Sequence, residues 1–151
     1  LITSGRKVVV SRTFSKAYGL AGLRVGYMMG SAEVIGLLNR VRQPFNVNLP
    51  ALAAAEAALD DADFVQRTRE VNATGLAQLA AGLTALGYEY IDGKANFLAA
   101  KIPDADALFT RLQKAGVIVR PLRGYGMVGW LRLTVGTSAQ NARLLAELAQ
   151  R

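Results

Sequence analysis

The sequence predicts a mixed fold, α/β or α+β, in which β-strands alternate with α-helices. Short runs of β-branched and apolar residues, such as residues 7–11, are typical of buried strands. They alternate with longer stretches in which apolar residues recur every three or four positions, as in residues 76–86. The chain has 151 residues, of which 52% are hydrophobic, enough for one core or for one full domain with part of another.

The first elements are two strands and a helix. We expect buried strands over residues 7–11 and 23–29, and the loop between them places Lys16 between two strand ends. A helix should begin at Ser31, whose side chain is a good N-cap, and end before Pro44. Apolar residues of this helix fall on one face.

Residues 43–50 form a turn-rich connector with two prolines, and we expect a domain junction there. Two helices should follow, the first ending near residues 60–61 and the second covering 63–86. The second carries a leucine stripe that is too short for a coiled coil and so indicates a core-facing helix, with Gly87 at its C-terminal end. The expected later elements are strands at 88–91, 96–102, 117–121 and 130–135, and helices at 104–114 and 139–150.

The composition excludes several kinds of site. The chain has no cysteine and no histidine, so it cannot form disulfides, and it cannot build a zinc site or a Ser-His-Asp triad alone. We therefore expect no metal site. Nucleophilic chemistry falls to lysine or to hydroxyl groups.

The formal net charge is +7, from 18 Lys and Arg against 11 Asp and Glu. The cations are dispersed and include arginines inside apolar segments, which favours small anionic ligands and argues against nucleic acid. No apolar run reaches the roughly 18 to 20 residues that span a bilayer, and no signal-peptide stretch is present, so we expect no membrane and a cytoplasmic location. The start at Leu1, without an initiator methionine, suggests a truncated piece of a longer protein.

The most informative segment is residues 11–27, SRTFSKAYGLAGLRVGY. It places the amine of Lys16 after the hydroxyls of Thr13 and Ser15 and eight residues before Arg24. An amine condenses with an aldehyde, and a guanidinium pairs with a phosphate through two hydrogen bonds. Taken singly, Lys16 and Arg24 could be a solvated charge and a strand-edge charge; together they indicate a site for a phosphorylated aldehyde. The glycine spacing does not fit a dinucleotide loop.

This segment closely resembles the lysine segment of the fold-type-I aminotransferases, in particular the histidinol-phosphate aminotransferases. Further similar segments are residues 41–48, 95–97, 116–122, 124–126 and 131–137. The resemblance implies that residues 1–47 end the large domain, which binds pyridoxal phosphate, and that residues 48–151 form the interdomain helix and the α+β small C-terminal domain. A complete member would also carry a long N-terminal portion with further cofactor-binding residues, none of which lies in this chain.

The resemblance also implies the cofactor and its ligands. Lys16 would bind pyridoxal 5′-phosphate covalently and would act as the base that transfers the proton. Thr13, Ser15 and Arg24 would hold the cofactor phosphate.

For the substrates, the resemblance implies that Arg132 clamps the carboxylate of glutamate or 2-oxoglutarate. The arginine that matches Arg120 would bind the phosphate of histidinol phosphate, and Asn96 would line the same pocket. The alternatives are an edge arginine paired with an acidic side chain, for Arg120 and for Arg132, and a capping or turn role for Asn96.

The expected function is transfer of an amino group between histidinol phosphate and 2-oxoglutarate or glutamate in histidine biosynthesis, by a homodimer. Two other hypotheses are compatible with the same resemblance: an aromatic or other class I/II aminotransferase, and an enzyme like phosphothreonine decarboxylase. A reading of another class is a non-catalytic fragment that serves packing or dimerisation.

Overall fold

The computed structural model describes residue 2 and residues 7–150, so the expectation about the start at Leu1 lies outside the described part. The chain divides into two compact units, Leu1–Thr68 and Arg69–Arg151, and each is described by itself. This division falls inside a long helix, α3 (Ala62–Ala85). The domain boundary expected near residue 47 concerns the complete fold and stays a prediction.

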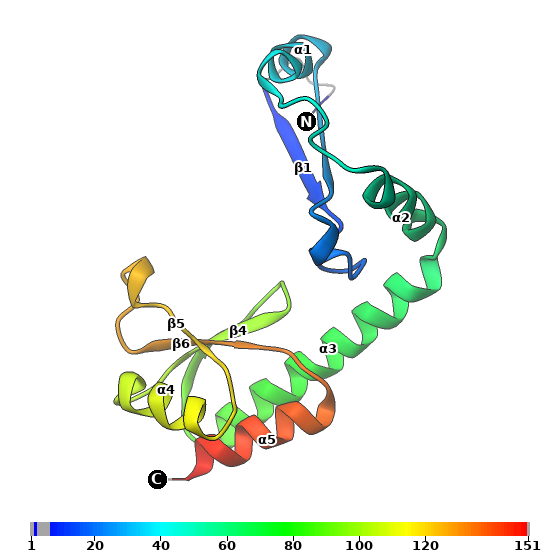
Figure 1. The fold of residues 1–151 in the computed structure, drawn as a ribbon. Helices are drawn as coiled ribbons and strands as arrows, with labels where there is room; N and C mark the ends of the chain where they lie inside the picture. Colours follow the sequence, from blue (N-terminus) through cyan, green and yellow to red (C-terminus); the bar gives the residue numbers. More distant parts are fainter. Residues whose placement is uncertain (1, 3–6, 151) are drawn as a thin grey trace. The chain divides into compact units, whose positions relative to one another are not determined.

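Unit 1 contains an antiparallel strand pair, β1 (Val9–Thr13) and β2 (Gly26–Gly30) (Figure 1). Strand β1 begins two residues later than expected and β2 three residues later. The later start of β2 follows from a 3-10 turn over Ala21–Leu23 and the left-handed Arg24, which occupy the start of the predicted strand. Both strands are largely exposed, so the predicted burial is wrong for the described structure. Apolar, β-branched composition favours a strand, but burial depends on what packs against its faces.

Two helices complete unit 1. Helix α1 (Ala32–Val41) begins where expected, since the Ser31 hydroxyl accepts a hydrogen bond from the Val34 amide at 3.4 Å. Helix α2 (Leu49–Asp60) is capped by Asn48, whose side-chain oxygen accepts from the Ala51 amide at 2.8 Å. The connector between them is irregular around Pro44, as predicted, whereas Pro50 lies in the first turn of α2 and not in the connector.

The described part of unit 2 forms a four-stranded antiparallel sheet in the order β3-β4-β6-β5 (Figure 1). Its strands are β3 (Glu89–Ile91), β4 (Phe97–Lys101), β5 (Arg120–Pro121) and β6 (Trp130–Thr134), and its helices besides α3 are α4 (Ala105–Lys114) and α5 (Ser138–Ala149). The strand expected at 117–121 is confirmed only at its last two residues. The other elements lie within two residues of the predicted bounds.

One face of this sheet packs against the helices of unit 2 and forms the hydrophobic core with them. Alternate residues of β4 and β6 point into it, and the helices cover them; the fully or almost fully buried members are Leu79, Leu83, Leu98, Ala100, Leu112, Leu131, Leu133 and Leu148. The leucine stripe of α3 is therefore core-facing, as predicted. Gly87 follows α3 with a φ of +75°, the left-handed conformation expected of a helix-ending glycine.

Two features let α3 and the β6–α5 turn approach closely. A Cβ on Gly75 would lie only 2.3 Å from a methyl carbon of Val135, so this helix position needs a glycine for a packing reason. Next to it, Asn141 is 1% exposed, and its side chain makes two hydrogen bonds. It accepts from the Gly136 amide at 2.9 Å and donates to Gln78 at 3.2 Å, so the buried amide is satisfied on both sides.

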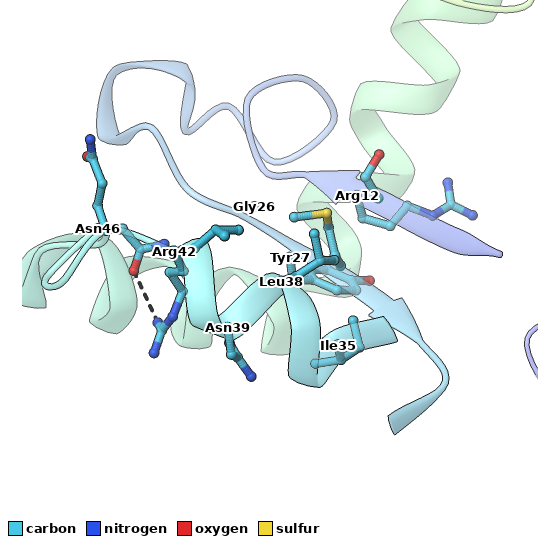
Figure 2. Close-up of a pocket in the computed structure, with 12 residues that line it drawn as sticks. Arg12, Gly26, Tyr27, Ile35, Leu38, Asn39, Arg42 and Asn46 are labelled. Atoms are coloured by element: carbon cyan, nitrogen blue, oxygen red, sulfur yellow. Dashed lines mark hydrogen bonds between the residues drawn. The ribbon is translucent and has the colours of Figure 1, made fainter. Parts of the chain in front are cut away.

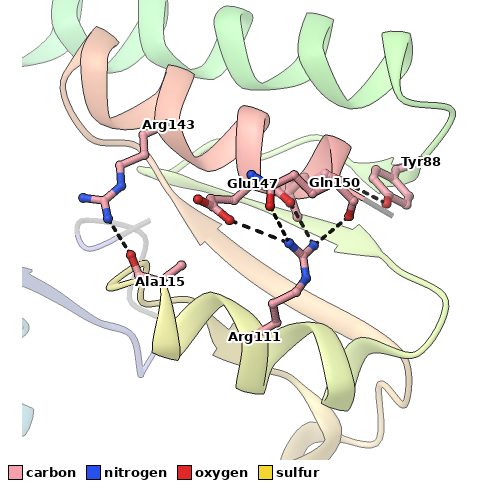
Figure 3. Close-up of polar contacts among 7 residues, drawn as sticks. Tyr88, Arg111, Ala115, Arg143, Glu147 and Gln150 are labelled. Atoms are coloured by element: carbon pink, nitrogen blue, oxygen red, sulfur yellow. Dashed lines mark hydrogen bonds and ion pairs between the residues drawn. The ribbon is translucent and has the colours of Figure 1, made fainter.

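Helices α4 and α5 hold each other's C-terminal ends through two arginines (Figure 3). Arg111 of α4 donates to the carbonyl oxygens of Glu147 and Gln150, each at 2.9 Å. Arg143 of α5 donates to the carbonyl oxygen of Ala115, the residue that caps α4. Carbonyl groups in the last turn of a helix lack partners within that helix, and cations are favourable at helix C-termini.

Candidate active site

The loop that carries Lys16 is anchored at both ends. The Phe14 amide donates to the Val25 carbonyl at 3.2 Å and closes the loop. Phe14 and Val25 are 4% and 6% exposed and pack against Ala51 and Ala55 of α2. The inward residues thus fix the loop on a small core, and the polar residues beside them face outward.

Three predicted site residues lie at the start of this loop. Thr13 ends β1, and its hydroxyl oxygen accepts from the Ser15 amide at 3.1 Å. Ser15 is half-buried and Lys16 is exposed. Because the Thr13 oxygen acts as acceptor here, its hydroxyl hydrogen stays available for an anion.

Arg24 returns to the same end of the strand pair, two residues before Gly26, which is the register partner of Thr13. Its backbone is left-handed, with a φ of 54°, which is uncommon for a residue with a side chain. One terminal nitrogen donates to the Ala21 carbonyl at 2.8 Å. This short-range bond steadies the guanidinium and leaves its other N–H groups for a ligand.

A cavity of about 640 Å³ in unit 1 lies elsewhere (Figure 2). It is lined by β1, β2, α1 and the following connector, including Arg12 and Arg42, and Arg42 donates to Asn46 at 3.2 Å. None of the predicted site residues lines it. The Lys16 loop therefore lies outside this cavity.

In unit 2 the two predicted substrate arginines are register partners. Arg120 of β5 lies directly opposite Arg132 of β6, so both side chains belong to the sheet face away from the core. Within residues 7–150 no ion pair is recorded for either arginine. The described structure therefore offers no acidic partner for Arg120.

Each arginine instead has an aromatic neighbour, which sequence reasoning missed. The guanidinium carbon of Arg132 lies 5.1 Å from the ring centre of Phe97, and that of Arg120 lies 5.8 Å from the ring centre of Tyr125. Arg120 also donates to the Tyr125 hydroxyl at 3.2 Å. The Nε atom of Arg132 is buried and has no hydrogen-bond acceptor. In the sequence, the one sign of these contacts is that Phe97 and Tyr125 lie in two of the segments that resemble the family, residues 95–97 and 124–126.

Asn96 precedes β4 and is exposed. Its carbonyl accepts from the Val135 amide at 2.9 Å, and no hydrogen bond is recorded for its side chain. Asn72 of α3 fixes the same turn by donating to the Ala95 carbonyl at 3.1 Å. The Asn96 backbone thus helps to hold this turn, and the predicted role of its side chain in the substrate pocket stays a prediction.

The predicted residues form two groups. Thr13, Ser15, Lys16 and Arg24 gather on one loop of unit 1, and Asn96, Arg120 and Arg132 lie in unit 2. Among the described residues, no helix is long and apolar enough to cross a membrane. The same residues contain no cluster of acidic side chains that could hold a metal ion.

Comparison with known proteins places this arrangement in a family. The model of the family "Aminotransferase class I and II" matches residues 1–148. Histidinol-phosphate aminotransferase 1 of Thiobacillus denitrificans is 57% identical over 143 residues, which are 95% of this chain and 37% of that protein. The chain thus spans well under half the length of that relative.

Solved structures show the same fold. Histidinol-phosphate aminotransferase from Sinorhizobium meliloti, solved with pyridoxal-5′-phosphate, has a TM-score of 0.83 at 28% identity, covering 94% of this chain and 40% of that one. L-threonine-O-3-phosphate decarboxylase from Porphyromonas gingivalis has a TM-score of 0.81 at 25% identity, covering 96% of this chain and 47% of that one. The predicted fold class is confirmed, and the chain belongs to the class I and II aminotransferase family.

Proposed function

We propose that the complete protein containing this chain is a pyridoxal 5′-phosphate-dependent histidinol-phosphate aminotransferase. It transfers an amino group between histidinol phosphate and 2-oxoglutarate or glutamate. The observation that carries the substrate assignment is the opposed pair Arg120 and Arg132. Two neighbouring guanidinium groups that have no ion pair with another described residue suit a substrate pair in which one member bears a phosphate and the other bears carboxylates.

The donor set on the Lys16 loop fits the cofactor. The hydroxyls of Thr13 and Ser15 and the free N–H groups of Arg24 are donors for a phosphate, and Arg24 supplies the opposite charge. The exposed Lys16 amine is the nucleophile that an aldehyde requires. When bound, pyridoxal phosphate supplies an electron sink for the substrate α-carbon.

Lys16 then acts as the general base and general acid. Its amine removes the proton from the substrate α-carbon, as a general base. The protonated amine then gives this proton back, as a general acid, to complete the transfer. Arg24 and the hydroxyls of Thr13 and Ser15 would hold the cofactor phosphate, which would keep the reacting group within reach of the Lys16 amine. Arg132 orients the carboxylate of glutamate, and Arg120 binds the phosphate of histidinol phosphate. Asn96 lines the same substrate pocket as the two arginines.

The test uses the complete protein with added pyridoxal phosphate. Amino transfer from histidinol phosphate to 2-oxoglutarate is measured beside transfer from phenylalanine and tyrosine. The proposal expects kcat/KM to be highest for histidinol phosphate. A preference for the aromatic amino acids would show an aromatic aminotransferase instead.

A second candidate is a decarboxylase of a phosphorylated amino acid, favoured by the structural similarity to the threonine-phosphate decarboxylase. Such an enzyme would release CO₂ from O-phosphothreonine, whereas a transaminase only binds the carboxylate. Release of CO₂ without formation of a keto acid would establish this alternative.

The remaining alternative is that the chain alone serves packing or dimerisation and cannot bind cofactor. Titration of the 151-residue chain with pyridoxal phosphate, followed by its absorption spectrum, separates the cases.

A homodimer and a cytoplasmic location are further proposals supported by the family resemblance. Sedimentation of the complete protein tests the first, and cell fractionation tests the second.

A further inference from the structure

The opposed arginines of unit 2 raise a physical problem. Like charges directly opposite each other in a sheet repel and destabilise it. Neither Arg120 nor Arg132 has a recorded ion pair within residues 7–150. The two guanidinium groups therefore need uncharged contacts that hold them in place before an anion arrives.

For Arg132 that contact is Phe97. In the β4–β6 ladder Phe97 is opposite Thr134, and Ala99 is opposite Arg132. Phe97 and Arg132 are thus diagonal neighbours on one face, a distance that long and aromatic side chains bridge. The small Ala99 leaves room for the arginine to extend toward the ring, whose centre lies 5.1 Å from the guanidinium carbon. This separation is within the cation–π range of about 6 Å.

For Arg120 the contact is Tyr125. This residue ends the 3-10 turn Arg123–Tyr125, which follows β5. Its hydroxyl accepts from one terminal nitrogen of Arg120 at 3.2 Å, and its ring centre lies 5.8 Å from the guanidinium carbon. The turn therefore places a ring and an acceptor on the same arginine.

The two aromatic contacts leave most N–H groups of Arg120 and Arg132 without a protein acceptor among the described residues. A ring face occupies none of the N–H groups of Arg132, and one hydroxyl occupies one of the five N–H donors of Arg120. An aromatic neighbour also brings no negative charge that would compete with an incoming anion. A carboxylate at either position would neutralise the guanidinium that the substrate needs.

We propose that Phe97 and Tyr125 are positioning residues for substrate binding: Phe97 orients Arg132 toward a carboxylate, and Tyr125 orients Arg120 toward a phosphate. This inference rests on the proposed aminotransferase function. Because each arginine has its own aromatic neighbour, a substitution at Phe97 or Tyr125 should weaken the binding of one anion and not of the other.

The test is a crossed set of variants in the complete enzyme with cofactor. Phe97→Leu removes the ring but keeps an apolar side chain, and it should raise KM for glutamate about three- to tenfold, with KM for histidinol phosphate within about twofold of wild type. Tyr125→Phe removes the hydrogen bond and should produce the reverse pattern. Phe97→Tyr keeps a ring over the guanidinium and should restore the glutamate KM.

Two controls separate positioning from packing. Phe109→Leu makes the same chemical change at a half-buried position of α4 that packs on the core of this unit, and it should leave both KM values unchanged. In an Arg132→Gln background, Phe97→Leu should have no further effect on glutamate. Calorimetric titration with glutarate, a dicarboxylate that cannot react, should show the same loss of affinity without turnover.

The outcomes distinguish this inference from the proposed function. If Arg132→Gln weakens glutamate but Phe97→Leu does not, the positioning role of Phe97 is wrong and the proposed function stands. Equal rises of both KM values in Phe97→Leu and Phe109→Leu would also overturn it, as a general packing loss. If Arg132→Gln and Arg120→Gln change neither KM, the proposed substrate assignment itself fails.

Discussion

Arg120 and Arg132 lie directly opposite each other in the β5–β6 ladder, on the sheet face that the core helices do not cover. Twelve positions separate them in the sequence, and a two-residue strand brings them together. The pair forms a concentrated positive charge without a recorded acidic partner among the described residues. This relationship makes the substrate assignment testable one arginine at a time.

Arg120→Ala in the complete enzyme should raise KM for histidinol phosphate far more than KM for glutamate, because the phosphate loses its clamp. Arg132→Ala should weaken glutamate at least as severely. Loss of a charge-assisted contact corresponds to roughly ten- to several-hundredfold in affinity. Steady-state kinetics with both substrates measures the split. Small, equal changes from Arg120→Ala would indicate a structural arginine and an enzyme for carboxylate substrates.

Borohydride reduction of the complete protein with pyridoxal phosphate should attach the pyridoxyl group to Lys16, because this amine lies on the loop that carries the phosphate donors. Peptide mapping by mass spectrometry locates the label. Lys101 is an internal control, since its amine already pairs with Glu89 at 3.1 Å. Label on Lys94, Lys101 or Lys114 in place of Lys16 would contradict the assignment.

Arg24→Lys should weaken cofactor binding by about 1.5–3 kcal/mol, because a lysine keeps the charge but loses the planar fork. Equilibrium dialysis of pyridoxal phosphate measures the change. Arg24→Gly is the matched variant, since glycine adopts the left-handed backbone of this position without strain. It should bind cofactor at least as poorly while folding normally. Unchanged affinity in both variants would show that Arg24 does not contact the phosphate.

Asn141→Ala should lower the free energy of unfolding by roughly 1–3 kcal/mol, because it leaves the partly buried Gly136 amide without its acceptor and the Gln78 side-chain oxygen without its donor. Urea unfolding followed by circular dichroism gives the value. Gln113→Ala on α4 is the control: that side chain is exposed and has no recorded hydrogen bond, so its effect should stay within about 0.5 kcal/mol. A similar loss in both variants would refute the role of Asn141.

Gly75→Ala should destabilise the protein although alanine favours helices. The new methyl group would meet Val135 at 2.3 Å, and overpacking of this kind costs about 1–3 kcal/mol. Gly36→Ala is the opposite case, because a Cβ there meets nothing within 4 Å and the helix gains about 0.5–1 kcal/mol. Thermal denaturation compares the two; stabilisation by both would mean that α3 can move away from the β6–α5 turn.

The sequence by itself determined the local elements. Ser31 caps α1, the leucine stripe of α3 faces the core, and Gly87 ends that helix in the left-handed conformation. These features depend on a few neighbouring residues, which is why spacing and residue type predict them. The Lys16 loop was also accessible to prediction, because its hydroxyls, amine and guanidinium lie within one short segment.

Tertiary structure alone decided the rest. Exposure of β1 and β2 depends on what covers their faces, and the short β5 depends on pairing with β6. The opposition of Arg120 and Arg132 and the contact of Phe97 with Arg132 follow from strand register. Register joins residues that are distant in the chain and is fixed by packing of the whole sheet on its core, so no local pattern carries it.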